Sequence, residues 1–164
     1  HAYVFFDNPR HTVHFSPHKA FEPPDASAWI RLPFVFEEID NNLRMLVDLP
    51  LGGHVVRVEF DTGGGKPGLS LMEAAWERVR HQLGARDVGH RHYRNVQFGR
   101  LPCRRYAAPT LTIGPMNVKD ARIDVVPQDN PVIRDFDGIL SLHYFRRTAV
   151  VLDFHQNLIW IRRS

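Results

Sequence analysis

Apolar and polar residues alternate along several short segments, and this period of two is typical of half-buried β-strands. The clearest case is residues 55–61, where apolar and charged side chains take turns. A second apolar stretch covers residues 43–49, and the sequence Pro-Leu-Gly-Gly at 50–53 supplies a turn between the two. Together these segments predict a β-hairpin whose second strand ends at Asp61.

Further apolar segments of similar length predict additional strands. They lie at residues 3–6, 12–15, 110–113, 119–126, 149–153 and 158–162. Residues 142–147 could form one short helical turn. The order of residues in segment 2–7 is echoed in segment 149–154. This echo could reflect paired terminal strands, a fragment cut from a longer protein, or chance, and we favour chance.

One helix is well marked between residues 70 and 84. Ser70, followed three residues later by Glu73, is a capping-box pattern, and Gly84 offers a C-terminal stop. Apolar side chains recur on one face at helical spacing, namely Met72, Ala75, Trp76, Val79 and Leu83. We expect this face to pack in the core of an all-β protein that contains one or two helices.

Composition places the chain among ordinary globular proteins. Its 164 residues are 43% hydrophobic and 24% charged, which suits one domain with a substantial core. No run approaches about 18 apolar residues, so no membrane span is expected. Cys103 is the only cysteine, which excludes an intrachain disulfide and a cysteine-built zinc site. No signal peptide is visible; the compartment stays open, and a periplasmic or secreted location is favoured over the cytoplasm.

The formal net charge of +3 is unevenly distributed along the chain. Arginines crowd the stretch from 78 to 105, in which Asp87 is the only acidic residue. Such a stretch could attract nucleic acid or an acidic partner. It lacks a periodic aromatic platform and matches no nucleic-acid motif. A solvated basic face is therefore favoured, and no nucleic-acid partner is expected.

Two other kinds of site can be weighed against the sequence. Glycines at 63–65 and Lys66 lie between a strand and a helix, as a phosphate-binding loop would. The Walker pattern, however, needs glycine where this chain has Phe60, and Ser or Thr where it has Pro67. Several histidines invite a metal site, namely His11, His14, His18, His90 and His92. They lack a neighbouring cysteine and the His-Glu-x-x-His pattern. We therefore expect neither a metal nor a cofactor.

The segment that carries chemistry is the end of the predicted hairpin. An apolar strand runs into Asp61-Thr62-Gly63, which places a carboxylate at a strand end, before a hydroxyl and a glycine that lets backbone approach closely. Further along, Asp137-Gly138-Ile139-Leu140 precedes an apolar-rich turn and a strand that ends in Asp153. In order and separation, these two segments resemble the two signatures of bacterial retropepsin-like aspartic proteases.

The resemblance covers about residues 29–163. It includes the strand and turn at Leu111-Thr112-Ile113-Gly114 and the approach to the hairpin at Leu32-Pro33-Phe34. It implies that residues 1–28 are N-terminal strands and a linker, and that residues 29–164 form a retropepsin-like domain. The fold implied is a closed β-barrel of the acid-protease type.

The resemblance also implies a site. Asp61 is the expected catalytic carboxylate, Thr62 braces its loop, and Gly63 permits close approach. The residues that match structural positions of the second signature are Asp137, Gly138, Ile139 and Leu140. Peptide hydrolysis by this route needs two carboxylates that share a proton around one water. Because the chain has a single Asp-Thr-Gly, the expected active species is a homodimer with two Asp61 side chains, cleaving peptides or unfolded protein.

Three features qualify this expectation. The basic stretch 86–99, which contains Gly89 and Tyr93, is the candidate for the flap that covers substrate. The glycine-rich segment 64–68 replaces the small residue and serines that the family has after its catalytic triplet. Ser141 stands where the family has glycine. These two departures leave open an alternative, a catalytically inactive module of the same fold that binds peptide or protein.

Overall fold

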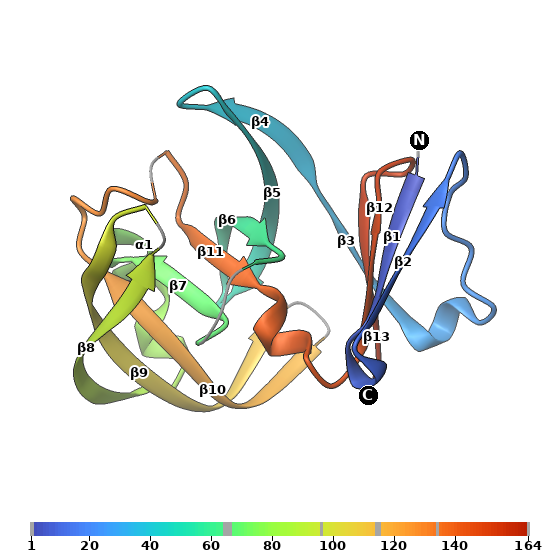
Figure 1. The fold of residues 1–164 in the computed structure, drawn as a ribbon. Helices are drawn as coiled ribbons and strands as arrows, with labels where there is room; N and C mark the ends of the chain where they lie inside the picture. Colours follow the sequence, from blue (N-terminus) through green and yellow to red (C-terminus); the bar gives the residue numbers. More distant parts are fainter. Residues whose placement is uncertain (1, 64–66, 96, 114–115, 134, 164) are drawn as a thin grey trace. The chain divides into compact units, whose positions relative to one another are not determined.

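The computed structural model describes residues 2–63, 67–95, 97–113, 116–133 and 135–163. Within them the chain is mainly β, with two sheets and one short α-helix (Figure 1). Its contacts form two compact units: unit 1 is His1–Phe36 with Phe145–Ser164, and unit 2 is Glu37–Tyr144. The domain division after residue 28 stays a prediction. No helix in the described part of the chain is long and apolar enough to span a membrane.

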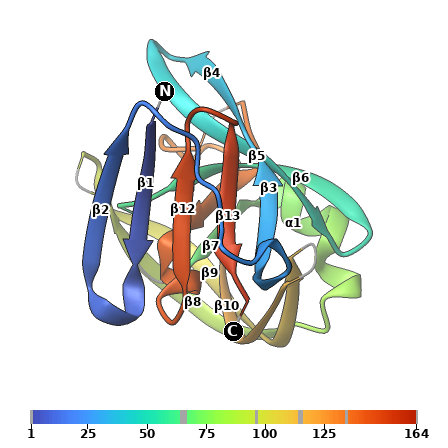
Figure 2. The same ribbon diagram turned by 90° about the vertical axis from the view of Figure 1, so that its right-hand side faces the viewer.

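Unit 1 is built on a five-stranded sheet in the order β2-β1-β12-β13-β3, with antiparallel neighbours throughout (Figure 2). Its strands are β1 (Ala2–Asp7), β2 (Thr12–Pro17), β3 (Trp29–Pro33), β12 (Ala149–Asp153) and β13 (Leu158–Arg162). Short 3₁₀ helices at Asn8–Arg10 and Ala26–Ala28 lie between the first three. All four predicted terminal strands are confirmed.

The echo between segments 2–7 and 149–154 corresponds to a pair of neighbouring strands. β1 pairs with β12 in a register that runs from Tyr3 opposite Asp153 to Asp7 opposite Ala149. Chance was therefore the wrong interpretation, because both segments are inner strands of one sheet and meet similar demands for apolar side chains. One face of this sheet carries an aromatic cluster around Phe21 and Trp160, whose rings lie edge to face at 5.7 Å between centroids.

Unit 2 is built on an eight-stranded sheet in the order β4-β5-β6-β11-β7-β10-β9-β8. Its strands are β4 (Val35–Ile39), β5 (Asn42–Leu51), β6 (His54–Asp61), β7 (Leu69–Met72), β8 (Arg86–Asn95), β9 (Gly99–Ile113), β10 (Met116–Val126) and β11 (Gly138–Ser141). The predicted hairpin is confirmed as β5 and β6. β11 lies between two partners, parallel to β6 and antiparallel to β7.

The helix starts later than the sequence predicts. α1 covers Glu73–Val79 and continues as a 3₁₀ helix at Arg80–Gln82, while Ser70 belongs to β7. The capping-box prediction is wrong because β7 is needed between β11 and β10, and that pairing overrides the local cap signal. The predicted core face of the helix is confirmed, since Trp76 and Val79 are buried. The predicted helical turn near residue 142 is a 3₁₀ helix at Leu142–Phe145.

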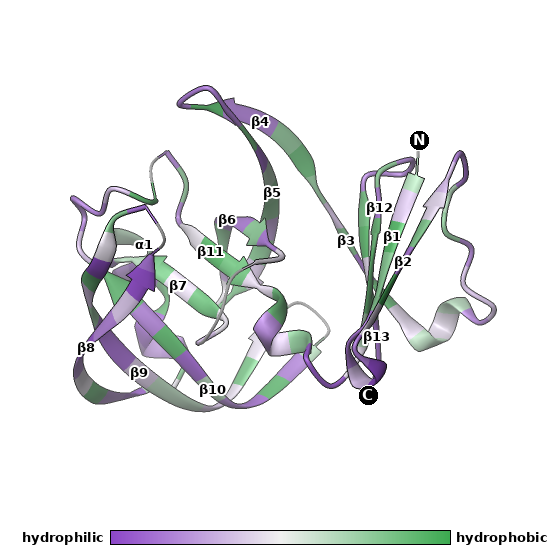
Figure 3. Ribbon diagram, in the orientation of Figure 1, coloured by the Kyte–Doolittle hydropathy of each residue, from purple (hydrophilic) through white to green (hydrophobic). Residues whose placement is uncertain are grey.

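The basic stretch forms most of a long hairpin, β8 and β9, at one end of the sheet. Figure 3 shows that β8 is mainly hydrophilic, whereas β9 carries both hydrophilic and hydrophobic residues. The pattern analysis missed β8 because most of its residues are exposed on both faces, so the strand lacks regular apolar alternation. In the described part of the chain each sheet has two end strands, so closure into one barrel stays a prediction.

Candidate active site

Asp61 is the last residue of β6, where the strand leaves the sheet of unit 2. The alternating pattern of β6 buries Val56, Val58 and Phe60 and leaves Asp61 half-buried on the other face. Its Oδ1 accepts a hydrogen bond of 2.8 Å from the backbone N–H of Gly63. This bond closes a tight turn and fixes the carboxylate at the strand end.

The residues that follow Asp61 are open to solvent. Thr62 and Gly63 are exposed, and Thr62 has no hydrogen bond within the described part of the chain. A Cβ added at Gly63 would lie 3.4 Å from Asp61 Oδ1, which is an ordinary contact. Among the described residues of one copy, neither the brace expected of Thr62 nor a steric need for glycine at 63 is found. Gly64 to Lys66 lie outside the described residues.

The second signature lies directly beside Asp61. β11 runs parallel to β6, with Ser141 opposite Asp61 and Leu140 opposite Phe60. The N–H of Ser141 donates to the carbonyl of Gly68 at 2.7 Å, and its Oγ accepts from the N–H of His143 at 3.2 Å. The structure thus brings together the two segments that the sequence analysis singled out, 80 residues apart in the chain.

Asp61 lines a cleft of about 730 Å³ within unit 2. Three other segments contribute to its walls: the β4–β5 turn around Asp40, the tip of the β8–β9 hairpin, and the segment 131–136. The tip contributes Asn95, Gln97 and the half-exposed ring of Phe98. The tip of the candidate flap thus lines the cleft that contains Asp61. Its arginines are not among the cleft-lining residues described.

A charged pair forms part of the cleft wall. Arg44 Nη1 lies 2.9 Å from both carboxylate oxygens of Glu59, and both residues line the cleft with Asp61. Glu59 and Asp61 are two apart in β6 and so share a face of the strand. Because Arg44 occupies both oxygens of Glu59, this second carboxylate is already committed to a partner.

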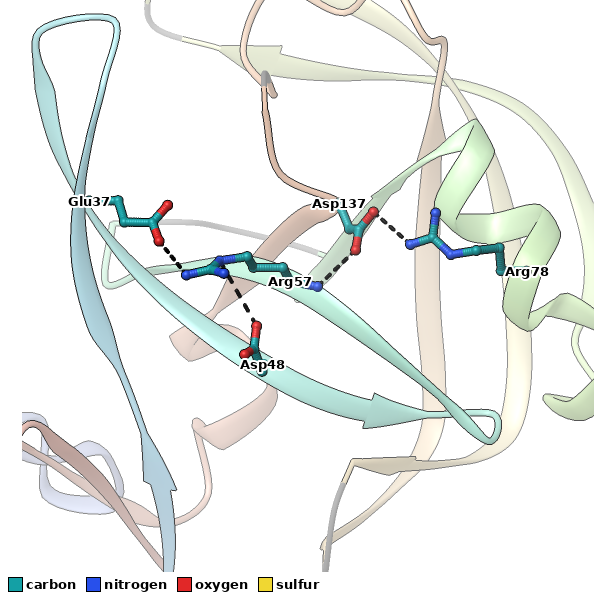
Figure 4. Close-up of polar contacts among 5 residues, drawn as sticks. All are labelled: Glu37, Asp48, Arg57, Arg78 and Asp137. Carbon is teal, nitrogen blue, oxygen red and sulfur yellow. Dashed lines mark hydrogen bonds and ion pairs between the residues drawn. The ribbon is translucent and has the colours of Figure 1, made fainter.

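Asp137 is held from several sides at the start of β11. Its carboxylate accepts from the N–H of Arg57 at 2.8 Å and from Arg78 Nη2 at 2.7 Å (Figure 4). Its backbone N–H donates to the carbonyl of Arg57 and its carbonyl accepts from the N–H of Met72. Arg57 also contacts Glu37. These contacts tie β11 to β6, β7 and α1, and they support the structural role that the resemblance implies.

The next three residues of the signature continue into the sheet. A Cβ added at Gly138 would lie 2.2 Å from the carbonyl oxygen of Ser70, so only glycine fits between β11 and β7. Leu140 is fully buried. Ile139 faces the other way and lines the cleft beside Asp61. One residue of this motif therefore reaches the candidate site.

Asp153, the aspartate that ends β12, is fully buried in unit 1. Its two oxygens accept four hydrogen bonds: from the N–H groups of Phe21, His155 and Gln156 and from the amide of Gln156. A carboxylate with this many donors stabilises a turn and has no free oxygen for catalysis. It is not a second catalytic group.

A buried polar cluster lies under the β8–β9 hairpin. Asp124 is fully buried and accepts two hydrogen bonds, of 2.7 and 2.8 Å, from Arg105. Desolvation by burial, reinforced by the charge of Asp124, raises the pKa of Cys103 to about 11. Desolvation also raises the pKa of Tyr93. A thiol this hard to ionise is a poor nucleophile at neutral pH, so Cys103 adds nothing to the candidate site.

Among the described residues, no three His, Cys, Asp or Glu side chains gather to hold a metal ion.

The cleft features that sequence reasoning missed are the β4–β5 turn and the segment 131–136. Asp40 and Asn41 both have positive φ, and an Asp-Asn pair is a turn signal that could have located the first. Segment 131–136 has no comparable signal.

Neither a protein-family model nor a curated protein matches the sequence. Similar solved structures include a retropepsin-like aspartic protease from Rickettsia conorii, 12% identical, with 81% of this chain and 89% of that chain covered and a TM-score of 0.48. Basic 7S globulin from soybean is 11% identical, with 99% of this chain and 50% of that chain covered and a TM-score of 0.53. This chain therefore spans half the length of the globulin. The likeness to the globulin concerns the fold alone, and the one to the Rickettsia protein is too weak to carry an argument.

Proposed function

We propose that the chain is an aspartic endopeptidase of the retropepsin type, acting as a homodimer in which two Asp61 carboxylates activate one water. The observation that carries the proposal is the position of Asp61, held by Gly63 at a strand end in a cleft beneath a hairpin tip. The parallel alignment of the two signature segments supports it. The closed acid-protease barrel belongs to the same proposal.

Each residue then has a defined part. One Asp61 carboxylate removes a proton from the water while the other, protonated, donates to the carbonyl oxygen of the peptide bond. The exposed hydroxyl of Thr62 is available to brace the loop of the second copy. Gly63, which has room for a side chain in one copy, would become the point of close approach between two copies. The hairpin tip holds the substrate against the pair.

The proposal places the second carboxylate on a second copy, because three carboxylates of the described chain already have partners. Glu59 is paired with Arg44, Asp137 bonds to Arg57 and Arg78, and Asp153 accepts four hydrogen bonds. A general acid and a general base must both reach the same water. A two-fold axis that passes between two Asp61 side chains supplies both from one sequence position.

The test is the Asp61→Asn variant, assayed on an unfolded protein substrate. Hydrolysis should fall by at least about a hundredfold, because the amide is neither base nor acid. Asp120→Asn is a matched control, since Asp120 is an exposed residue of β10 with positive φ, which asparagine also tolerates. Wild-type activity should be blocked by statine-type transition-state mimics.

Mixing the two forms tests the shared site. If one active site needs two Asp61 residues, equal amounts of wild-type and Asp61→Asn chains should, after exchange, retain about a quarter of the wild-type activity per total chain. Independent sites would retain about half. A value of one half would contradict the shared-site mechanism even if Asp61 proved essential.

One observation favours a second candidate, a module that binds peptide without cutting it. Ser141 places a side chain opposite Asp61, where the resemblance predicts glycine, and its N–H and hydroxyl are both engaged in the loop. In that case wild type and Asp61→Asn should bind a peptide equally, and neither should hydrolyse it.

A further inference from the structure

The outer half of the β8–β9 hairpin is a two-stranded ribbon. The pairing of β9 with β10 ends where Arg104 lies opposite Val125. The pairing with β8 continues outward to Asn95 opposite Gly99. A ribbon of two strands is marginally stable by itself in water. The position of its tip therefore depends on side chains that reach from the ribbon to the rest of unit 2.

Tyr93 makes such a contact. Its hydroxyl oxygen accepts from Asn130 Nδ2 at 2.9 Å and lies 3.2 Å from Asn130 Oδ1, to which it can donate. Its ring packs on the buried cluster that includes Cys103 and Ile133. The ring thus anchors the ribbon by packing, and the hydroxyl adds a directional bond between two segments 37 residues apart.

Asn130 is a firm partner for this bond. Its side chain is buried, and its Oδ1 also accepts from the N–H of Val132 at 3.0 Å and of Ile133 at 3.3 Å. These bonds fix the start of segment 131–136. The Tyr93–Asn130 contact therefore joins two segments that line the same cleft, the hairpin tip and segment 131–136.

We propose that Tyr93 is a positioning residue, whose hydrogen bond to Asn130 acts as a latch that holds the hairpin tip over the Asp61 cleft. A neutral hydrogen bond of this kind contributes a modest net free energy, so the latch can open without unfolding of unit 2. Its consequence for substrate rests on the proposed function. The effect of the latch on the position of the ribbon does not rest on the proposed function. The latch and the proposed function can therefore be tested separately.

The first experiment measures backbone amide hydrogen exchange in residues 91–103 of the whole chain. Tyr93→Phe keeps the ring and removes the hydroxyl, so exchange in this ribbon should rise between about twofold and tenfold. The matched control is Tyr106→Phe. Tyr106 also lies on the hairpin and packs on Trp76, and no hydrogen bond of its hydroxyl is found within the described residues. This control should leave ribbon exchange unchanged.

The partner-side variant is Asn130→Ser, whose hydroxyl can still cap the following amides but cannot span to Tyr93. It should raise ribbon exchange in the same way. Once either variant has broken the latch, the other should add nothing, so the double variant should match the single ones. Unchanged exchange in both single variants, or fully additive effects, would overturn the latch.

The second experiment measures peptide hydrolysis by the same variants. Tyr93→Phe should raise KM several-fold while kcat changes less, because the tip is held less often over the substrate. A wild type that hydrolyses nothing while the exchange effect persists would reject the proposed function and leave the latch standing. An active wild type whose KM and ribbon exchange are both unaffected by Tyr93→Phe would reject the latch alone.

Discussion

Gly138 has no room for a side chain in unit 2. Between β11 and β7 a Cβ would meet the carbonyl oxygen of Ser70 at 2.2 Å and Leu71 Cδ2 at 2.9 Å. Backbone oxygen of a central strand cannot move aside as a flexible side chain can. The conformation of this glycine is ordinary, so the requirement is one of space and is dictated by strand pairing.

Gly138→Ala should therefore destabilise the fold by about 3 kcal/mol, at the upper end of what overpacking costs. Gly53→Ala is the control. Gly53 has a φ of +76° but open space around it, so alanine there should cost about 1 kcal/mol of conformational strain. Urea unfolding of both variants gives the comparison. Equal losses would mean that the β11–β7 contact is looser than described.

Cys103 offers a residue-scale test of the buried polar cluster. Its pKa of about 11, against 9.0 for a free thiol, means that folding opposes ionisation. At pH 9 alkylation by iodoacetamide should be slow in the folded protein and fast in denaturant. The sign for stability follows: the contribution is complete below pH 9 and is lost as pH rises toward 11. Equal alkylation rates in native and denatured protein at pH 9 would refute the buried environment.

At the scale of elements, Asp137 decides how α1 and β11 are joined. Its bond to the N–H of Arg57 joins two inner strands of the sheet at the start of β11, whereas its partner Arg78 is 42% exposed in its side chain. Asp137→Ala should cost about 2 kcal/mol, because it leaves a backbone donor without its acceptor. Arg78→Ala should cost less than about 1 kcal/mol, as solvent-exposed ion pairs do. Thermal or urea unfolding would rank the two, and the reverse order would contradict this account.

The elements also show what local patterns can predict. The hairpin of β5 and β6 follows from alternation and a glycine turn, both of which are local. The start of α1 could not be predicted, because Ser70 has a good cap pattern and is nevertheless required in a strand between β11 and β10. β8 was not predicted because its partly buried residues, such as Tyr93, are few and are separated by exposed arginines and histidines. Tertiary pairing decided both cases.

At the scale of the whole molecule, the mainly β fold class was predictable. Asp61 and Ser141 could be placed near one another only through the resemblance, since their contact is a parallel strand pair with no local signal. The cleft walls were not predictable beyond the hairpin. Segment 131–136 reaches the cleft through Asn130 and its cap, a long-range arrangement that no periodicity encodes.

The shared site predicts how activity depends on concentration. Because dimers dissociate by mass action, activity per chain should fall on dilution once the concentration nears the dissociation constant. Initial rates over a dilution series, compared with the mass measured by light scattering, would test this. Constant activity per chain while the measured mass falls to that of one copy would rule out the homodimer. Asp120→Asn should follow the wild-type curve.

Unit 1 is built from two separate segments of the sequence, and this affects how the chain can fold while it is being synthesised. Unit 2 is one continuous segment, so all its strands are present when residue 144 has been made. β3, by contrast, has only β13 as a neighbour, and β1 needs β12. Apolar side chains of β3 such as Ile30 and Leu32 must therefore wait, unpaired, until more than a hundred later residues have left the ribosome. During that interval the nascent chain presents a ready substrate for chaperones, and its final pairing is the step most exposed to misassembly.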